Sequence, residues 1–195
     1  MIGKADGVEV PLNFDLREAE KYDLKNKYAP ITENKDVKID PRRVVHEKDK
    51  YHPMAEPLHL LKNVKHKTKV YSKRRYNWSG VSLEKGKSYR ISVADNQIWE
   101  DGGIDCTADG WKSKQLNFAK EFVFEKLEHR RRCPDANWFQ LVGSYGDEDD
   151  YVFPIGTKAT ITAERDADLY LFANDLNTFY FNNKGFLDVV VEKIE

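Results

Sequence analysis

Short oxygen-bearing side chains gather near the C-terminal end of the chain, where they have the chemistry of a cation site. Asp175 ends an apolar stretch, Asn182 and Asn183 come shortly before the next one, and Asn174 supplies a further oxygen. Carboxylate and amide oxygens are the ligands that a hard cation such as calcium prefers. The same residue types are common in turns, because they tolerate a positive φ and bond their own backbone. The pattern therefore predicts either a calcium site or a structural turn at a sheet edge.

The elements that would position this loop are short strands. Segments that are β-branched or aromatic, and bounded by Gly, Asp or Asn, recur at 80–83, 88–94, 139–144, 158–163, 169–173 and 187–191. Regularly spaced short strands favour an all-β fold, here an antiparallel β-sandwich of the galactose-binding or jelly-roll type. Segment 115–130 has apolar residues at both helical and strand spacing, and we predict one short helix there.

Composition divides the chain near residue 70. Residues 1–60 are dense in Lys, Asp, Glu and Pro and show no sustained apolar alternation, so we expect an extended N-terminal arm or linker over 1–70. The sandwich is predicted over 71–195. No apolar run reaches the length of a transmembrane helix, and the N-terminus does not resemble a signal peptide. We expect a soluble protein, cytoplasmic or secreted without a cleavable signal, and Cys106 and Cys133 leave the compartment open.

Motifs of known enzyme classes are incomplete in this chain. The nearest approach to a nucleophile elbow is Val142-Gly143-Ser144-Tyr145-Gly146, in which Val142 occupies the place of the first glycine. The spacing of His46, His52, His59 and His66 does not put two of them on one helix face, as a zinc protease motif would. We find no phosphate-binding glycine loop in the sequence. The chain is therefore predicted to be non-catalytic.

A basic stretch between residues 62 and 75 holds seven Lys or Arg side chains. Such a stretch suits phosphates, yet Lys65, Lys67 and Lys69 alternate as on the exposed face of an edge strand, where lysines block unwanted pairing. The net charge of the whole chain is -1, so no global field favours nucleic acid. We do not expect a nucleic-acid partner; a lipid head group or an acidic neighbour remains compatible.

Several motifs in the C-terminal part follow one another in a familiar order. They are Gly80-Val81-Ser82-Leu83, Ile98-Trp99-Glu100-Asp101-Gly102, Phe139-Gln140-Leu141-Val142-Gly143-Ser144, Phe153-Pro154-Ile155-Gly156, Asn174-Asp175 and Asn182-Asn183-Lys184-Gly185. With them, segment 78–194 resembles the bacterial calcium-dependent galactophilic lectins, which are small β-sandwiches. The last two motifs are the specific ones.

The resemblance implies a set of calcium ligands. In these lectins the Asp of the Asn-Asp pair, two consecutive Asn, a Thr between them and a main-chain carbonyl of the Trp loop hold the ion. These positions correspond here to Asp175, Asn182 and Asn183, to Thr178 (one place from the matching position) and to the main chain near Asp101. The ion in that family also binds two sugar hydroxyls. The His and Gln that read galactose have no counterpart around residues 107–111, so galactose specificity does not carry over.

A second resemblance covers the arm and the segment 132–139. Val44-Val45-His46-Glu47, Tyr51-His52-Pro53 and Arg132-Cys133-Pro134-Asp135-Ala136-Asn137-Trp138-Phe139 look like C-terminal regions of bacterial phospholipase-like effectors of type VI secretion and related α/β-hydrolases. This resemblance implies a lectin-like tail whose partner is a hydrolase body or a secretion component.

Together these observations predict a binding module that recognises a carbohydrate or lipid head group. Asp175 and Asn182 would contact the ligand through calcium, and Trp99 and Trp111 would stack on the apolar face of a sugar. Trp78 and Trp138 are expected in the core, where large aromatic side chains mostly lie. The alternative is a protein-docking module in which the Asn-Asp loop is purely structural.

Overall fold

A computed structural model describes residues 2–5, 8–11, 50–51, 56–115 and 118–195 of the chain. They fall into two compact units, Met1–Asp49 and Lys50–Glu195. In the first unit, β1 (Ile2–Ala5) pairs antiparallel with β2 (Val8–Pro11). Most of the predicted arm lies outside the described residues, and so do His46 and His52.

The first sheet of the second unit has six strands. They are β3 (Lys50–Tyr51), β4 (Leu58–His59), β6 (Tyr76–Leu83), β10 (Leu141–Tyr145), β11 (Val152–Pro154) and β13 (Ala167–Ala173). Their order is β11-β10-β13-β6-β3, and β4 also pairs with β6. The two short strands β3 and β4 run parallel to β6, whereas the other pairs are antiparallel.

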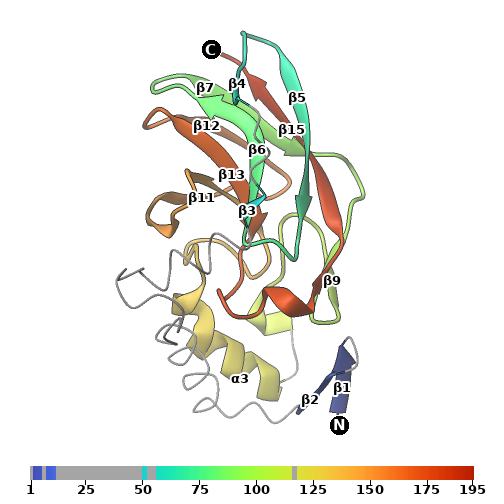
Figure 1. Cartoon of the computed structure of the whole chain (residues 1–195). Coiled ribbons are helices and arrows are strands. Elements are labelled where there is room, and N and C mark those ends of the chain that lie inside the picture. Colours follow the sequence, from blue (N-terminus) through green and yellow to red (C-terminus); the bar gives the residue numbers. More distant parts are fainter. Residues whose placement is uncertain (1, 6–7, 12–49, 52–55, 116–117) are drawn as a thin grey trace, which may run out of the picture. The chain divides into compact units, whose positions relative to one another are not determined.

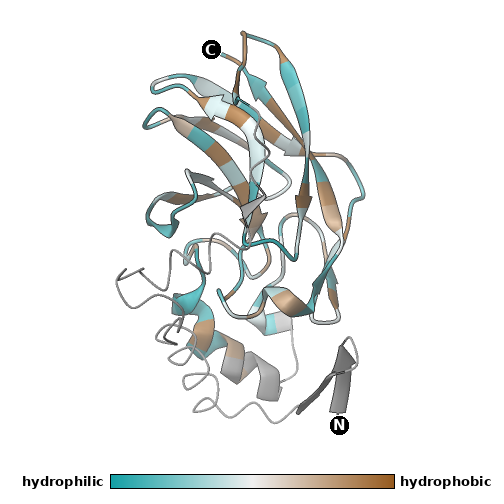
Figure 2. Cartoon of the chain, in the orientation of Figure 1, coloured by the Kyte–Doolittle hydropathy of each residue, from teal (hydrophilic) through white to brown (hydrophobic). Residues whose placement is uncertain are grey.

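The second sheet has four antiparallel strands. They are β5 (Lys65–Tyr71), β7 (Ser88–Val93), β12 (Lys158–Thr162) and β15 (Phe186–Lys193), in the order β12-β7-β15-β5. Along β15 the side chains of Leu187, Val189 and Val191 are fully buried, while Asp188 is exposed. Figure 2 shows the resulting alternation of apolar and polar positions along the strands. A strand with this alternation buries one face and leaves the other to solvent.

The two sheets form a sandwich, and the central strand β13 of the first sheet is buried on both faces. Leu169 and Leu171 of β13 face the second sheet, and β13 and β6 both contact β5 (Figure 1). Tyr170 and Phe172 point to the other face and pack in a cluster with Tyr76, Trp78, Cys133, Ala136 and Val142. Burying an apolar side chain such as Val142 or Phe172 contributes about 1.5–3 kcal/mol. Segment 133–136 thus closes the outer face of the first sheet.

Helical turns and a small sheet complete the second unit. The helical segments are η1 (Ser113–Gln115), α3 (Phe118–Leu127), η2 (Glu128–Arg130), η3 (Asp149–Tyr151) and η4 (Tyr180–Asn182). Trp111 and Trp138 stack with ring centroids 5.6 Å apart, and Phe124 of α3 meets both rings edge-on. These contacts hold α3 against the sandwich. The small sheet has the order β14-β8-β9, from β14 (Asn183–Lys184), β8 (Trp99–Asp101) and β9 (Ile104–Cys106).

The all-β sandwich with one short helix agrees with the prediction from the sequence, and strands also occur before residue 71. Strands β3 and β4, and β5 up to Val70, come before residue 71 and belong to the sheets of the second unit. Only Val70 of β5 is fully buried, and β4 is exposed, so neither strand carries a clear apolar alternation. Trp78 and Trp138 are buried as expected. No helix within the described residues is long and apolar enough to cross a membrane.

Candidate functional site

Two loops that are distant in sequence meet at one end of the sandwich. Asp175 is the second residue after β13, and Asn183 of β14 is paired across the small sheet with Asp101 of β8. The β8–β9 turn brings Asn182 close as well, because a Cβ atom at Gly102 would lie only 2.6 Å from Asn182 Nδ2. The structure therefore brings together Asp101, Asp175, Asn182 and Asn183, which we call the carboxylate–amide cluster.

Hydrogen bonds fix the two carboxylates of this cluster. Asp175 Oδ1 accepts from the Leu176 main-chain N–H (2.6 Å), and Asp175 Oδ2 accepts from Asn183 Nδ2 (3.1 Å). Asp101 Oδ2 accepts from the indole Nε1 of Trp111 (2.9 Å). Both carboxylates are buried, with exposed fractions of 8% for Asp101 and 3% for Asp175.

Two amide oxygens in the cluster have no donor. Asn183 Nδ2 donates to Asp175 and to the Ser72 carbonyl (3.3 Å), which turns its Oδ1 away from both. Within the described part of the chain, the buried Oδ1 atoms of Asn182 and Asn183 accept no hydrogen bond. A buried polar atom without a partner costs about 1–3 kcal/mol. Such atoms are rare in folded proteins and mark places where a ligand, an ion or water belongs.

The cluster is also electrostatically unfavourable without a cation. Burial and the negative charge of Asp175 hold the pKa of the Asp101 carboxyl well above its usual range. Burial raises the pKa of Asp175 to about 6, although hydrogen bonds from Asn183 and Leu176 oppose the rise. Two desolvated carboxylates beside each other disfavour ionisation, and a divalent cation between them would remove that cost.

The donor set fits a hard cation better than a transition metal. No three His, Cys, Asp or Glu side chains gather in a metal-binding group anywhere in the described residues. The oxygen donors are instead two carboxylates and two amides, the mixture that calcium accepts along with main-chain carbonyls and water. The neighbouring turn is open to solvent, since Gly102, Gly103 and Phe181 are exposed.

Across the described ranges of the chain, two other residues near the cluster in sequence, Asn174 and Thr178, make no hydrogen bond to its four side chains. Asn174 is fully buried. Its Oδ1 accepts from the Cys133 main-chain N–H, and its Nδ2 donates to the carbonyls of Cys133 and Asn137. Asn174 therefore fastens segment 133–137 to β13. Thr178 is half-buried in the turn between Asp175 and Asn182, and no hydrogen bond joins it to the four cluster residues within the described structure.

The predicted stacking role of Trp99 and Trp111 is wrong. Their exposed fractions are 1% and 4%, so neither ring face is available to a sugar. Trp99 packs edge-on against Phe139 at 5.0 Å, and Trp111 stacks on Trp138. Their indole N–H groups donate inside the fold, that of Trp99 to the Thr107 carbonyl and that of Trp111 to Asp101. Trp111 acts on the cluster by supporting Asp101.

We predict that Trp111→Phe lowers the free energy of unfolding by about 1–3 kcal/mol more than Trp78→Phe does. Both changes remove an indole N–H that donates to a carboxylate, but Asp101 is buried whereas the Trp78 partner Asp168 is half-exposed. Urea unfolding of both variants at neutral pH measures the difference. Equal losses would show that Trp111 gives no special support to Asp101.

A buried arginine, which the sequence did not indicate, holds the loop between Asp175 and Asn182. Arg132 Nη1 donates to the Tyr180 hydroxyl (2.8 Å), and that hydroxyl donates to the Ala173 carbonyl. Arg132 also bonds Asp149 through Nε and Nη2 (2.9 and 2.6 Å). These partners are far apart in sequence, so no local motif could reveal the network.

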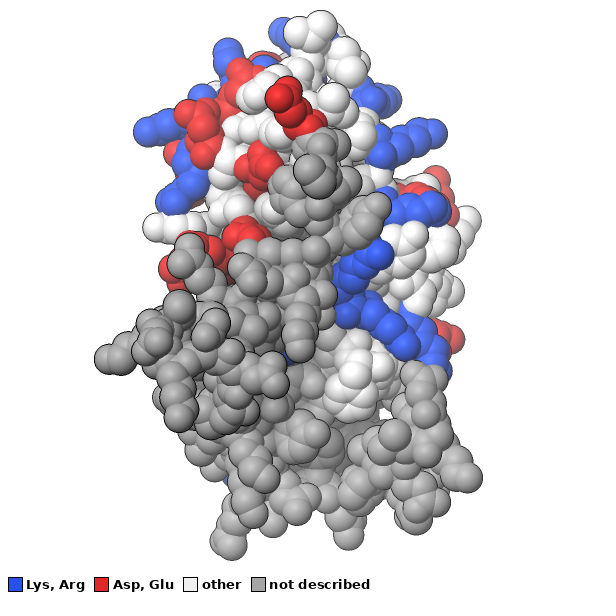
Figure 3. Space-filling model, viewed as in Figure 1, with Lys and Arg blue, Asp and Glu red and all other residues white. Residues whose placement is uncertain are grey.

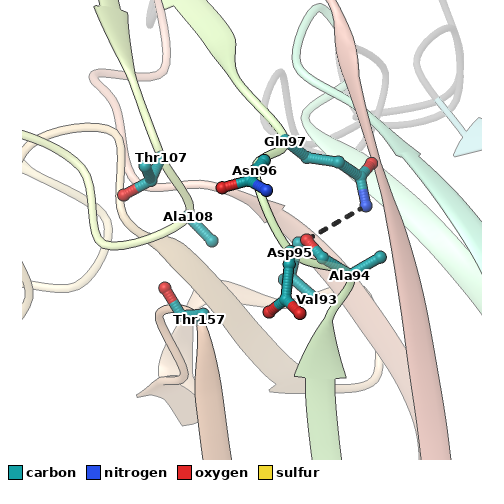
Figure 4. Close-up of a pocket in the computed structure, with 8 residues that line it drawn as sticks. All are labelled: Val93, Ala94, Asp95, Asn96, Gln97, Thr107, Ala108 and Thr157. Atoms are coloured by element: carbon teal, nitrogen blue, oxygen red, sulfur yellow. Dashed lines mark hydrogen bonds between the residues drawn. The ribbon is translucent and has the colours of Figure 1, made fainter.

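A separate hollow of about 380 Å³ opens on the second unit (Figure 4). Its lining is Val93, Ala94, Asp95, Asn96, Gln97, Thr107, Ala108 and Thr157. Thr107 and Thr157 face Asp95 and Asn96 across it, and Gln97 Nε2 donates to the Ala94 carbonyl (3.4 Å). None of these residues belongs to the carboxylate–amide cluster.

The fold and the cluster define a β-sandwich protein with a polar, oxygen-rich site at the end of its sheets. No protein-family model matches the chain, and no curated protein matches it either. One similar solved structure is described as "EclA N-terminal domain; PllA-like lectin". It has 19% sequence identity and a TM-score of 0.48, and the likeness covers 67% of this chain and 98% of that one.

Proposed function

We propose that the chain is a non-catalytic module that recognises a carbohydrate through calcium held by Asp101, Asp175, Asn182 and Asn183. The observation that carries the proposal is the pair of buried amide oxygens without donors beside two buried carboxylates. Calcium takes six to eight oxygen ligands in a flexible arrangement. The four side chains leave coordination positions open, and vicinal hydroxyls of a sugar are oxygen ligands of the required kind. A lipid head group with vicinal hydroxyls offers the same chemistry.

The chain offers no nucleophile at the position where the sequence comes nearest to one. Ser144 is fully buried within β10, and its Oγ donates to the Gly146 carbonyl (2.7 Å). A nucleophilic serine needs an exposed Oγ on a strand-to-helix turn, next to a base. This environment supports a binding role rather than hydrolysis at Ser144.

The second candidate is a docking module for a hydrolase body or a secretion component, with a structural Asn-Asp loop. It is favoured by the internal bonding of the loop, because Asn174 ties together segment 133–137 and Asp175 accepts the Leu176 N–H. On this view the cluster would bind water rather than calcium. The titration below separates the two candidates.

We predict that chelator-treated wild-type protein binds calcium, with one ion per chain, and that Asp175→Asn does not. Isothermal titration calorimetry measures both. Asparagine is the appropriate substitution because Asp175 is buried rather than on an exposed edge, so alanine would leave a cavity as well as remove the charge. Asp105→Asn serves as the matched control, since Asp105 lies on the same small sheet but is exposed.

Equal calcium binding by wild type and Asp175→Asn, or no heat in wild type, would refute the site and favour the docking module. Calcium binding by wild type and by Asp105→Asn, but not by Asp175→Asn, supports the site. A glycan array probed in calcium and in chelator then tests carbohydrate recognition, and calcium-dependent signals on it are the expected result.

A further inference from the structure

A row of Lys and Arg side chains lies beside the carboxylate–amide cluster, and the function proposed above does not use it. Residues 57–83 contain no Asp or Glu. Within this stretch, the following side chains form what we call the β5 strip: Lys62, Lys65, Lys67, Lys69, Lys73 and Arg74. Figure 3 shows Lys and Arg side chains gathered on the side of the unit where β5 runs in Figure 1.

The positive charge of the strip is only partly neutralised by the chain itself. Strand β15, the neighbour of β5, carries two acidic side chains opposite it. Asp188 pairs with Lys69 (2.8 Å), and Glu192 pairs with Arg90 of β7 (3.1 Å). Lys62, Lys65 and Lys67 have no carboxylate partner among the residues that the structure describes. The fields of Lys65 and Lys67 add, because side chains two residues apart on one strand face lie about 7 Å from each other, within about one Debye length at physiological salt.

The geometry of the strip is linear. Strand β5 is an edge strand of the second sheet, and side chains two residues apart on one face are about 7 Å from each other. Lys65, Lys67 and Lys69 share one face, and all three are exposed. A charged chain laid along β5 could meet successive cations without bending.

The strip ends at the carboxylate–amide cluster. Ser72 Oγ, in the turn after β5, donates to the Gly185 carbonyl (3.0 Å), and Asn183 Nδ2 donates to the Ser72 carbonyl. The same turn therefore carries the last cations of the strip and contacts a cluster residue directly.

Two exposed aromatic rings lie at this junction. Tyr71 and Phe186 are 38% and 41% exposed, with ring centroids 5.8 Å apart. Lys69 Nζ sits 3.9 Å from the centre of the Phe186 ring, and the Arg74 guanidinium 4.5 Å from that of Tyr71. These cation–π contacts restrict the conformations of the Lys69 and Arg74 side chains before any ligand binds, which reduces the entropy lost on binding. Exposed ring faces beside fixed cations suit the apolar face of an acidic sugar.

We propose that the β5 strip binds a polyanionic polysaccharide, one that carries sulfate or carboxylate groups, as a subsite continuous with the carboxylate–amide cluster. The choice of a glycan as the occupant rests on the proposed function. Blocking of strand pairing accounts for lysines on β5, and Lys62, Lys73 and Arg74 extend the strip beyond the two ends of the strand.

The test measures binding of a heparin fragment by titration at about 50 mM and about 200 mM salt, with neutral dextran as the control ligand. We expect wild type to bind the fragment and to lose affinity as salt rises. The variant Lys65→Gln/Lys67→Gln should bind about tenfold more weakly at low salt. Lys87→Gln/Lys158→Gln, which removes two exposed lysines elsewhere in the sandwich, should bind as wild type does.

Three results would overturn the proposal. They are no binding of the fragment at low salt, equal weakening in both double variants, and equal or tighter binding of anionic lipid vesicles or a single-stranded oligonucleotide. Calcium and heparin titrations of wild type and Asp175→Asn test the two sites separately. Retained heparin binding without any calcium binding in wild type would leave the strip standing and refute the calcium site. Calcium binding in wild type without heparin binding would refute the strip alone.

Discussion

Replacing Arg132 with methionine is expected to lower the free energy of unfolding by about 3–5 kcal/mol, because a buried ion pair then loses one partner. The Arg132 side chain is 1% exposed and bonds Asp149, Tyr180 and the Arg75 carbonyl. Its guanidinium also lies 3.5 Å from the centre of the Phe172 ring. Methionine fills much of the same volume, so the loss reports the charge and its hydrogen bonds rather than an empty cavity.

The loss should lie toward the lower end of that range, since the Asp149 side chain keeps 30% of its exposure and water can reach it. Burial alone raises the pKa of Asp149, but the Arg132 guanidinium more than offsets this and holds that pKa below its usual value. Without Arg132, the carboxylate keeps the desolvation and loses the cation.

Urea unfolding at neutral pH measures the effect, and Arg90→Met is the control. Arg90 also pairs with a carboxylate, Glu192, but its side chain is 40% exposed, so its removal should cost less than about 1 kcal/mol. Similar losses in the two variants would contradict the structural role of Arg132. Arg132→Lys should fall between wild type and Arg132→Met, because lysine keeps the charge but not the planar fork of donors.

Recurring short segments of β-branched or aromatic residues between turn residues allowed the sandwich to be predicted from the sequence. In one of these segments, Leu187, Val189 and Val191 are buried on one face of β15. Strand β5 shows where this signal fails, because His66 and Thr68 stand where apolar residues would reveal the buried face. An edge strand needs little apolar surface, so its pattern is weak even though its pairing with β15 is complete.

The candidate site was predictable only in part. A resemblance placed Asp175, Asn182 and Asn183 in one ligand set, and the fold brings them together with Asp101. The burial of Trp99 and Trp111 was not predictable, since a tryptophan next to turn residues has the same local sequence pattern whether it faces solvent or the core. The Arg132 network joins residues 17 to 57 positions apart, and such contacts depend on the finished fold.

The buried carboxylate pair changes how the stability of the folded state depends on pH. Burial raises the pKa of Asp175 to about 6, above the value of about 4 in an unfolded chain. Between these two values the folded state binds more protons than the unfolded state, so stability falls as pH rises. We therefore expect the metal-free protein to lose about 2–3 kcal/mol at this position between pH 4 and pH 7. Asp175→Asn should not show this loss, because it has no charge to bury.

Calcium should reverse the trend. The ion binds ionised carboxylates, so its affinity rises as Asp101 and Asp175 lose their protons, and it stabilises the folded state in proportion to the logarithm of its concentration. Urea unfolding of wild type, Asp175→Asn and Asp105→Asn, in chelator and in excess calcium at about pH 4.5 and 7.5, measures both effects. Other acidic groups, Asp149 among them, change all three proteins alike, so the difference between wild type and Asp175→Asn isolates the pair. A metal-free wild type that gains stability relative to Asp175→Asn as pH rises would mean that the carboxylates are already neutralised within the chain, and the cluster would then have no need of a cation.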